Sequence, residues 1–522
     1  MKDGRGRSGA VGGGQGILRV WLAFLLAIHP GRLSAQCPDG STPPCQSTVA
    51  RGRPASNTVA VLYFENRSRD TSDAYLAEGL TEDIITRLGQ VDRLAIQSSN
   101  SVRRFRGRAY EDLPAVGRAL GVGNLVTGSV RRFDRHLRVT VELARAASGV
   151  HLWGDSYDRP DTDLFAIEEE IAGAVATAIT GRLLASERTA LTARPAVSGG
   201  AYDHFLRGNH FLAQRTAAAM GKAVDEYEAA IKAEPGFVEG YAGLAEAYAL
   251  FLEWGWVRPG VPAESVLARG TAAAERALQL GPTSSNAWLA ECYITSFSHP
   301  LDYADVLAAG RRAVTLDPRN AEAQHTYGTR LIEAGRDSEA VEAYQRALAI
   351  DPLRPITLAL VGRREMMAHR FAAARRWVDS ALAADPGFAP GYAFRARLFL
   401  LLGDAASARH DAETTDHLST ADPIQGATVM AMVLAREGDT SAARARLAGV
   451  LQARESSALL SARDGTWLAS ALISAGDTLR ALDLLDRLKP SYKVWNLLRF
   501  PELDPIRGNP RFQRLVEESR PR

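Results

Sequence analysis

The chain contains 522 residues, of which 62 are basic and 60 are acidic, so its formal net charge is +2. This length is enough for two or three folded domains. The balanced charge argues against a nucleic-acid partner, because proteins that bind nucleic acids usually present a strongly basic surface.

Residues 1–35 have the three-part layout of a secretory signal peptide. Basic residues precede the apolar run Ile17–Ile28, and cleavage is expected after Ala35. This run is shorter than the stretch of about 20 apolar residues that a membrane-spanning helix needs. We therefore expect a protein exported to the periplasm or cell envelope, whose mature chain has no integral membrane segment. An uncleaved interfacial helix and a misassigned start codon are the alternatives.

The segment 36–57 is rich in proline, serine and threonine and is predicted to be a linker. Cys37 and Cys45 bracket a turn-rich stretch of it and could form a disulfide in an oxidising compartment. A lipid anchor on Cys37 is the alternative, although Gln36 stands where a small residue would be expected. Cys292, farther along the chain, is predicted to be a small core residue.

Residues 58–192 alternate between strand and helix patterns. The run Thr58–Phe64 is apolar and rich in β-branched and aromatic residues, as a buried strand is. In the stretch His136–Leu143 apolar and polar residues alternate, so one face of that strand should be buried and the other solvated. Apolar residues at helical spacing predict helices over Asp73–Gln90 and Leu164–Leu184. The predicted order is strand, helix, strand, helix, three strands and a closing helix, which defines an α/β domain with a mixed sheet.

Five motifs of this segment are similar to those of the TolB amino-terminal-like, or FlgO-like, domain: VAVLYFEN, AEGLTEDIITRL, LGVGNLVTGSVRR, LRVTVEL and GVHLWGDSYDR. The similarity covers nearly all of residues 58–192 and includes Gly79, Glu82, Trp153 and Tyr157. None of the matching residues is known to be catalytic in that family. The resemblance implies an α/β binding or assembly module, which in bacterial proteins commonly precedes tetratricopeptide repeats and accompanies a kinase or a cyclase.

Between residues 201 and 489 a helical pattern recurs with a fixed period. Pro318, Pro352 and Pro386 are each separated by 34 residues (352−318 and 386−352). Proline lacks a backbone donor and disfavours helical geometry in the preceding residue, so each of these prolines is expected to follow the end of a helix. Such a period is typical of a stacked array of helical hairpins.

The block 321–354 indicates how one hairpin would pack. Gly328 on its first helix and Ala340 and Ala347 on its second are small, which allows the two helices to approach closely. The block resembles the tetratricopeptide repeat (TPR) family in these positions. The resemblance implies an all-α superhelical solenoid of six to eight hairpins over residues 201–489.

In the TPR family the concave surface is lined by first-helix positions and holds an extended or helical peptide. Carried over by position, the predicted partner-binding groove consists of Glu322, His325, Thr329, Ile332, Arg363 and Arg397. This mixture of charge and apolar area suits a protein or peptide partner, including one that presents a carboxylate. Residues 490–522 resemble the capping segment that often closes such arrays.

The sequence contains no recognised motif for catalysis or cofactor binding. A phosphate-binding loop, a zinc-spaced Cys or His cluster, a nucleophile elbow and a kinase or cyclase signature are all missing. No cofactor and no metal are therefore expected. Glu82, Asp83 and the acidic run Glu168–Glu170 are predicted to lie on solvated helix faces.

These observations favour a non-enzymatic exported scaffold or adaptor that binds a partner protein or peptide through its concave groove. The first alternative is a sensory or regulatory input component of a bacterial signalling system, acting with a separate kinase or adenylate cyclase. The second alternative is a hydrolase or transferase with an unrecognised site.

Overall fold

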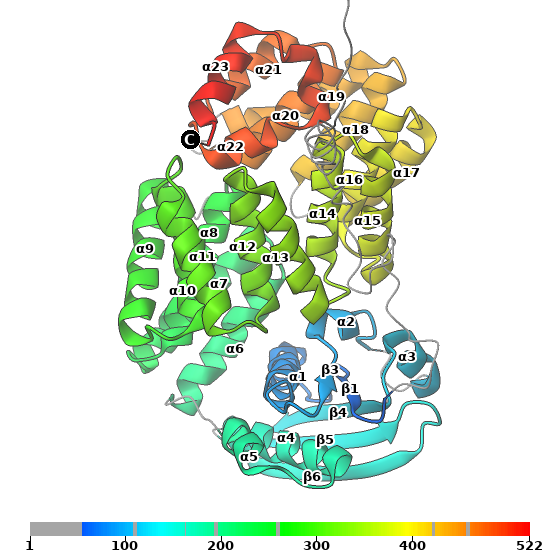
Figure 1. Cartoon of the computed structure of the whole chain (residues 1–522), viewed down its shortest axis with the longest axis vertical. Helices are drawn as coiled ribbons and strands as arrows, with labels where there is room; N and C mark the ends of the chain where they lie inside the picture. The colour runs from blue at the N-terminus through cyan, green and yellow to red at the C-terminus, as the bar shows by residue number, and fades with distance from the viewer. Residues whose placement is uncertain are drawn as a thin grey trace, which may run out of the picture. The chain divides into compact units, whose positions relative to one another are not determined.

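The computed structural model describes residues 55–107, 112–161, 163–192, 197–256, 262–419, 423–455 and 460–521, which all belong to one compact unit. A mixed β-sheet with flanking helices is followed by a long series of α-helices, which confirms the predicted fold class (Figure 1). The predicted signal peptide, most of the predicted linker, Cys37 and Cys45 lie outside the described residues.

One mixed sheet organises the α/β part of the described chain. Its elements are β1 (Thr58–Val61), β2 (Glu65–Asn66), η1 (Thr71–Asp73), α1 (Ala74–Leu88), β3 (Ala95–Ile96), α2 (Ser99–Arg103), α3 (Leu113–Leu120), β4 (Asn124–Phe133), β5 (His136–Arg145), β6 (His151–Pro160), α4 (Leu164–Thr180) and α5 (Ala185–Leu191). The strands lie in the order β3-β1-β4-β5-β6, with β2 paired to β4. β1 runs parallel to β3 and β4, and β2 runs parallel to β4, whereas β5 is antiparallel to both β4 and β6.

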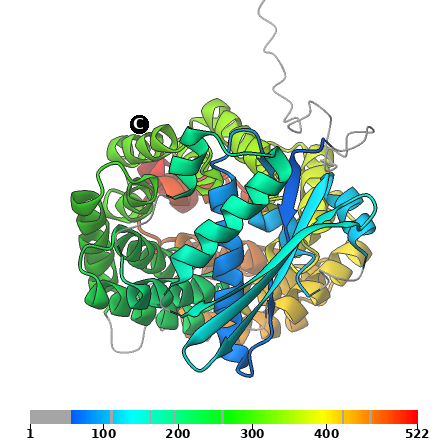
Figure 2. The same ribbon diagram turned by 90° about the horizontal axis from the view of Figure 1, so that it is seen from below.

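Helices cover the two faces of this sheet differently. α1 and α4 lie side by side on one face (Figure 2), where Ile84 and Ile171 are fully buried in the same core as Val139 of β5. α2 and α3 cover the other face, and Val102 and Leu125 are buried there. The buried and exposed residues of β5 alternate, which confirms the pattern predicted for that strand.

In the described residues, the helical part consists of eight hairpins, the upper end of the predicted range. The pairs are α6 (Gly199–Ala213) and α7 (Ala217–Ala233), α8 (Val238–Trp254) and α9 (Ala263–Leu280), α10 (Ser285–Ser298) and α11 (Ala304–Leu316), α12 (Ala321–Glu333) and α13 (Asp337–Ile350), α14 (Pro355–Met367) and α15 (Phe371–Ala384), α16 (Ala389–Leu402) and α17 (Ala405–Leu418), α18 (Pro423–Arg436) and α19 (Thr440–Glu455), and α20 (Ala462–Ser474) and α21 (Thr478–Leu485). Successive first helices such as α6, α8, α10 and α12 contact one another, so they line the inner side of the array.

Hairpin α12–α13 shows the close helix approach that its small residues predict. A Cβ atom at Gly328 would stand 2.9 Å from the ring of Tyr344, and Ala340 and Ala347 are fully buried. Gly335, at the turn between the two helices, has a φ of 74°, a left-handed conformation that glycine adopts without steric cost. Side-chain size therefore sets the spacing of the two helices.

The C-terminal segment joins distant parts of the array. It contains α22 (Tyr492–Leu497), η2 (Pro501–Ile506) and α23 (Pro510–Ser519), which pack on α20 and α21 (Figure 1). The segment also reaches earlier hairpins, because α22 contacts α12 and the Lys493 Nζ lies 2.5 Å from a carboxylate oxygen of Glu253 in α8. The rings of Tyr492 and Tyr303 pack at 4.9 Å between centroids. The last hairpin is thus tied to the first half of the array.

Polar contacts connect the α/β part to the array. Ser98 and Asn100 donate hydrogen bonds of 2.5 and 2.8 Å to the carboxylate of Asp351, which follows the end of α13. The Tyr75 hydroxyl in α1 donates a 2.5 Å hydrogen bond to Asp203 in α6. Helices α1 and α6 therefore form a joint between the two parts.

Candidate functional site

Two of the six predicted groove residues are buried within their own repeat region. The imidazole Nδ1 of His325 lies 2.9 Å from the Thr357 hydroxyl, and the His325 ring packs 5.9 Å from that of Tyr344. Ile332 is 2% exposed and belongs to a core that also contains Tyr303. Their side chains are therefore occupied by neighbouring hairpins.

Arg397 lies beneath the C-terminal segment. Its Nε donates a 2.7 Å hydrogen bond to Glu502, and its guanidinium lies 4.2 Å from the centre of the Phe500 ring. The Arg397 side chain is only 2% exposed. It cannot contact a partner in this structure, because Phe500 and Glu502 of the C-terminal segment cover its guanidinium.

The other three predicted groove residues remain accessible in part. Glu322 accepts a 2.8 Å hydrogen bond from the Tyr293 hydroxyl and forms an ion pair with Arg354. The Thr329 hydroxyl is hydrogen-bonded to Tyr344, and Arg363 on α14 is partly buried. Within the part of the chain that the structure describes, Arg363 forms no ion pair. Its guanidinium is therefore the most available of the predicted groove cations.

The inner side of the first four hairpins contains a pocket of about 200 Å³, called here the inner pocket. It is lined by Phe205, Asn209, Tyr227, Glu239, Ala242, Gly243, Glu246, Asn286, Leu289, Ala290 and Glu322. Three of these residues are glutamates, and they lie beside apolar and aromatic side chains. The pocket is built almost entirely from the first helices α6, α8, α10 and α12.

The pKa values of Glu246 and Glu322 in the inner pocket are shifted in opposite directions. Burial raises the pKa of Glu246 to about 7, opposed by Arg215, whose guanidinium is 3.7 Å away. Burial also disfavours ionisation of Glu322, but Arg354, His325, Arg215 and the hydrogen bond from Tyr293 together outweigh it and lower the pKa of Glu322 to about 2. The low pKa favours the ionised form of Glu322 at neutral pH, whereas the raised pKa of Glu246 lies near neutral pH.

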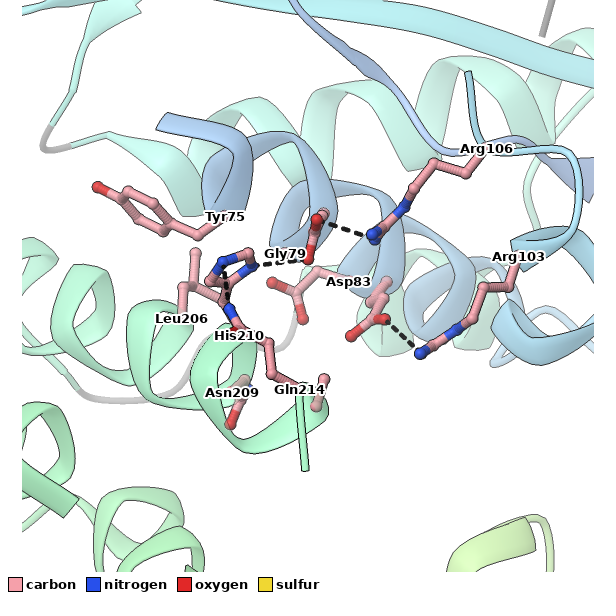
Figure 3. A pocket seen from close by; sticks show the side chains of 12 residues that line it. Tyr75, Gly79, Asp83, Arg103, Arg106, Leu206, Asn209, His210 and Gln214 are labelled. Carbon is pink, nitrogen blue, oxygen red and sulfur yellow. Dashed lines mark hydrogen bonds and ion pairs between the residues drawn. The ribbon is translucent and has the colours of Figure 1, made fainter. Parts of the chain in front are cut away.

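A second pocket of about 130 Å³ lies at the joint between α1, α2 and α6 and is called here the joint pocket (Figure 3). It is lined by Tyr75, Glu78, Gly79, Glu82 and Asp83 of α1, by Arg103 and Arg106 at and after α2, and by Leu206, Asn209, His210, Ala213 and Gln214 on and after α6. The two pockets share Asn209.

Opposite charges face each other across the joint pocket. Arg106 lies 2.9 Å from Glu78, and the imidazole Nδ1 of His210 lies 2.9 Å from the other oxygen of the same carboxylate. Arg103 is 3.9 Å from Glu82, and both of these side chains are 43% exposed. Figure 3 shows the two arginines extending towards the carboxylates of α1.

The prediction that Glu168 lies on a solvated helix face is wrong, and Asp83 is only partly exposed. Glu168 is 1% exposed and lies 3.3 Å from Arg87, and the Tyr202 hydroxyl donates hydrogen bonds to both Asp83 and Glu168. Burial raises the pKa of Asp83 to about 6 and holds the pKa of Glu168 well above its usual range. The helical pattern could not reveal this cluster, because α1, α4 and α6 meet only in the tertiary structure.

Neither a metal-binding group nor a membrane-spanning helix is found in the described ranges. No set of three or more His, Cys, Asp or Glu side chains there could hold a metal ion. No helix among the same residues combines the length and the apolar character needed to cross a bilayer. Burial raises the pKa of the Cys292 thiol to about 12, and Cys292 is fully buried, as expected of a core residue rather than a nucleophile.

The fold and its inner surface define an α/β domain followed by a TPR solenoid. No protein-family model matches the chain. A protein of Rhizobium meliloti (strain 1021) named "Putative adenylate cyclase 3" is 33% identical over 192 residues, which is 37% of this chain and 32% of that protein. The alignment thus spans about a third of that relative's length.

Solved structures with similar helical repeats include PilW, a widely conserved type IV pilus biogenesis factor, and YrrB, a TPR protein with an unusual peptide-binding site. PilW is 21% identical, with a TM-score of 0.34, and the match covers 43% of this chain and 96% of PilW. YrrB is 14% identical, with a TM-score of 0.26, and the match covers 38% of this chain and 95% of YrrB.

Proposed function

We propose that the chain is a non-enzymatic scaffold that binds an extended segment of a partner protein along the inner side of helices α6 to α14. The observation that carries this proposal is the inner pocket, because residues of four successive first helices converge there. A ligand that crosses several repeats in turn is the mode of binding that such a surface allows.

The lining of the inner pocket favours a partner segment with a basic side chain between apolar ones. Glu239, Glu246 and Glu322 supply the negative charge, and Leu289 and Tyr227 supply apolar area. An arginine or lysine would gain charge-assisted hydrogen bonds there. A cation near Glu246 would also keep that carboxyl ionised, so binding should be stronger above pH 7 than below it.

Arg363 extends the proposed groove beyond the inner pocket. It lies on α14, next along the array from α12, and with Arg354 it contributes positive charge around His325. We expect it to meet a carboxylate of the bound segment. Glu322 and Thr329 remain part of this proposed groove, whereas the buried His325, Ile332 and Arg397 act by shaping the array.

The proposal is tested with a displayed library of random peptides followed by fluorescence anisotropy on the enriched sequences. Arg363→Glu should weaken binding about tenfold or more, as expected for loss of a charged hydrogen bond, without changing the melting temperature. The matched control is Arg276→Glu on the exposed side of second helix α9. Equal binding by both variants would remove Arg363 from the groove, and a library without enriched sequences would count against the scaffold itself.

A second candidate function is a regulatory input component that acts with a separate kinase or adenylate cyclase. The partial similarity to a protein named as a putative adenylate cyclase favours it. The resemblance of residues 58–192 to the TolB amino-terminal-like domain belongs to the same proposal, since that module commonly accompanies such enzymes. Cyclic AMP measured in cells with and without this chain would test it, and identical levels would count against a link to a cyclase.

We also propose that the chain is exported, on the basis of the signal-like pattern in residues 1–35. Alkaline phosphatase serves here as a reporter that is active only outside the cytoplasm. A fusion of residues 1–57 to this enzyme should therefore be active in cells. An inactive fusion would place the protein inside the cell.

A further inference from the structure

The joint pocket adjoins the inner pocket at Asn209 but has its own lining on α1 and α2, and its size limits what it can hold. A cavity of about 150 Å³ accommodates benzene, and one water molecule occupies about 30 Å³ in the liquid. At about 130 Å³ the joint pocket can hold a compact molecule of a few heavy atoms. A nucleotide or a peptide segment would not fit inside it.

The charges around the joint pocket are nearly balanced. Glu78, Glu82 and Asp83 oppose Arg103 and Arg106, and His210 adds a group that hydrogen-bonds to Glu78. A phosphate would be repelled by the three carboxylates, and a simple cation by the two guanidiniums. The lining is therefore complementary to a molecule that carries both charges.

One ion pair in the pocket is open. Glu78 and Arg106 are in direct contact at 2.9 Å, whereas Glu82 and Arg103 are separated by 3.9 Å, beyond hydrogen-bond distance. Glu82 is held in place by a 2.8 Å hydrogen bond from the Tyr63 hydroxyl. The same Tyr63 hydroxyl interacts with Arg103. A guanidinium has five N–H donors and a carboxylate has several acceptor sites, so both Arg103 and Glu82, which line the pocket, keep further hydrogen-bonding capacity.

We infer that the joint pocket binds a small zwitterion, such as a free α-amino acid, with its ammonium on Glu82 and its carboxylate on Arg103. The two charged groups of an α-amino acid are about 3 Å apart, close to the 3.9 Å between Glu82 and Arg103. The ligand can lie alongside this pair in antiparallel orientation, so that its ammonium is next to the Glu82 carboxylate and its carboxylate is next to the Arg103 guanidinium. Two charge-assisted hydrogen bonds then form without separating the protein groups.

The other walls support this arrangement. A Cβ atom at Gly79 would stand 2.7 Å from Leu206, so α1 and α6 meet closely and close the apolar end of the pocket. Asn209 and Gln214 add amide groups on the side of the array. A bound zwitterion would contact the α/β part and the array together, so binding should stabilise the joint between them.

The test is isothermal calorimetry and thermal unfolding of the full chain with each of the twenty common amino acids, and with methylamine and acetate as probes that carry one charge. At least one amino acid should bind and raise the melting temperature, while both single-charge probes should bind more weakly. Glu82→Gln and Arg103→Gln should each weaken binding about tenfold or more. The control is Arg118→Gln, at an exposed position of α3 outside the pocket.

Three results would overturn the inference: no amino acid binds at millimolar concentration, acetate or methylamine binds as tightly as the best amino acid, or both pocket variants bind like the control. Circular dichroism and melting of each variant without ligand show whether it is folded. Both substituted side chains are 43% exposed, so the variants should fold. Peptide binding by the inner surface is measured separately and does not depend on this outcome.

Discussion

The buried ion pair between Arg397 and Glu502 provides a direct test of how the array is closed. The two side chains are 2% and 5% exposed, and the Nε–Oε1 distance is 2.7 Å. Replacing Arg397 with methionine keeps most of the side-chain volume but leaves the Glu502 carboxylate buried without its cation. Removing one partner of a buried pair typically costs 3–5 kcal/mol.

The detailed geometry favours the lower end of that range. Both terminal guanidinium nitrogens of Arg397 and the second carboxylate oxygen of Glu502 are buried without a hydrogen bond, so the pair is held by one strong contact. The guanidinium otherwise faces the rings of Phe500 and Trp467, at 4.2 and 5.4 Å, which methionine can also contact. We therefore expect Arg397→Met to cost about 3 kcal/mol.

The assay is urea denaturation followed by far-ultraviolet circular dichroism, applied to a double-mutant cycle. Replacing both partners, as in Arg397→Met with Glu502→Leu, should restore most of the lost stability, because apolar pairs of similar size commonly match a buried ion pair. A single variant as stable as the wild type, or a double variant less stable than the single one, would refute the reasoning. If Arg397→Met is as stable as the wild type but does not bind peptide, Arg397 contacts the bound peptide directly.

Two further predictions concern buried positions. Ala347 is fully buried, so Ala347→Leu should overpack hairpin α12–α13 and lower the free energy of unfolding in urea by about 1–3 kcal/mol. The control Ala372→Leu, at an exposed position of α15, should leave the free energy of unfolding unchanged. An Ala347→Leu variant as stable as the wild type would contradict the proposed packing. The folded-state pKa of Glu168 is raised, so above the unfolded pKa of about 4.3 the native state retains a proton that the unfolded state has lost, and wild-type stability falls as pH rises. Glutamine does not titrate, so Glu168→Gln removes this pH dependence. The unfolding free energy of the variant minus that of the wild type should therefore increase from about pH 4.3 upwards, by at most about 1.4 kcal/mol per pH unit. A difference that does not change with pH would show that Glu168 is ionised in the native protein.

Local patterns were sufficient for the elements and for the packing inside each hairpin. Gly328, Ala340 and Ala347 lie within one repeat, so spacing along the sequence reports their contact directly. The alternation in β5 likewise depends only on which face of the sheet is covered. In the hairpin, the contacting residues are close in sequence. In β5, the buried face would be covered by any helix that packs on that side of the sheet.

The candidate sites could be predicted only in part. First-helix positions predict that Glu322, Thr329 and Arg363 face the inner side of the array, and of these three residues Glu322 lines the inner pocket. The same rule placed Arg397 there, but Glu502 is 105 residues away and covers it. No periodic signal reports such a contact, since it depends on small rotations between repeats that accumulate along the array.

The sequence by itself determined that this protein has a mixed α/β domain followed by stacked helical hairpins, because prolines, small residues and apolar spacing act over a few turns of chain. Only the tertiary structure decided which charges are buried and which remain available. The joint pocket brings Glu78 next to His210, 132 residues later, and the buried carboxyl cluster brings Arg87 next to Glu168, 81 residues later. Desolvation depends on every element that packs around a group, and that information is absent from any single stretch of sequence.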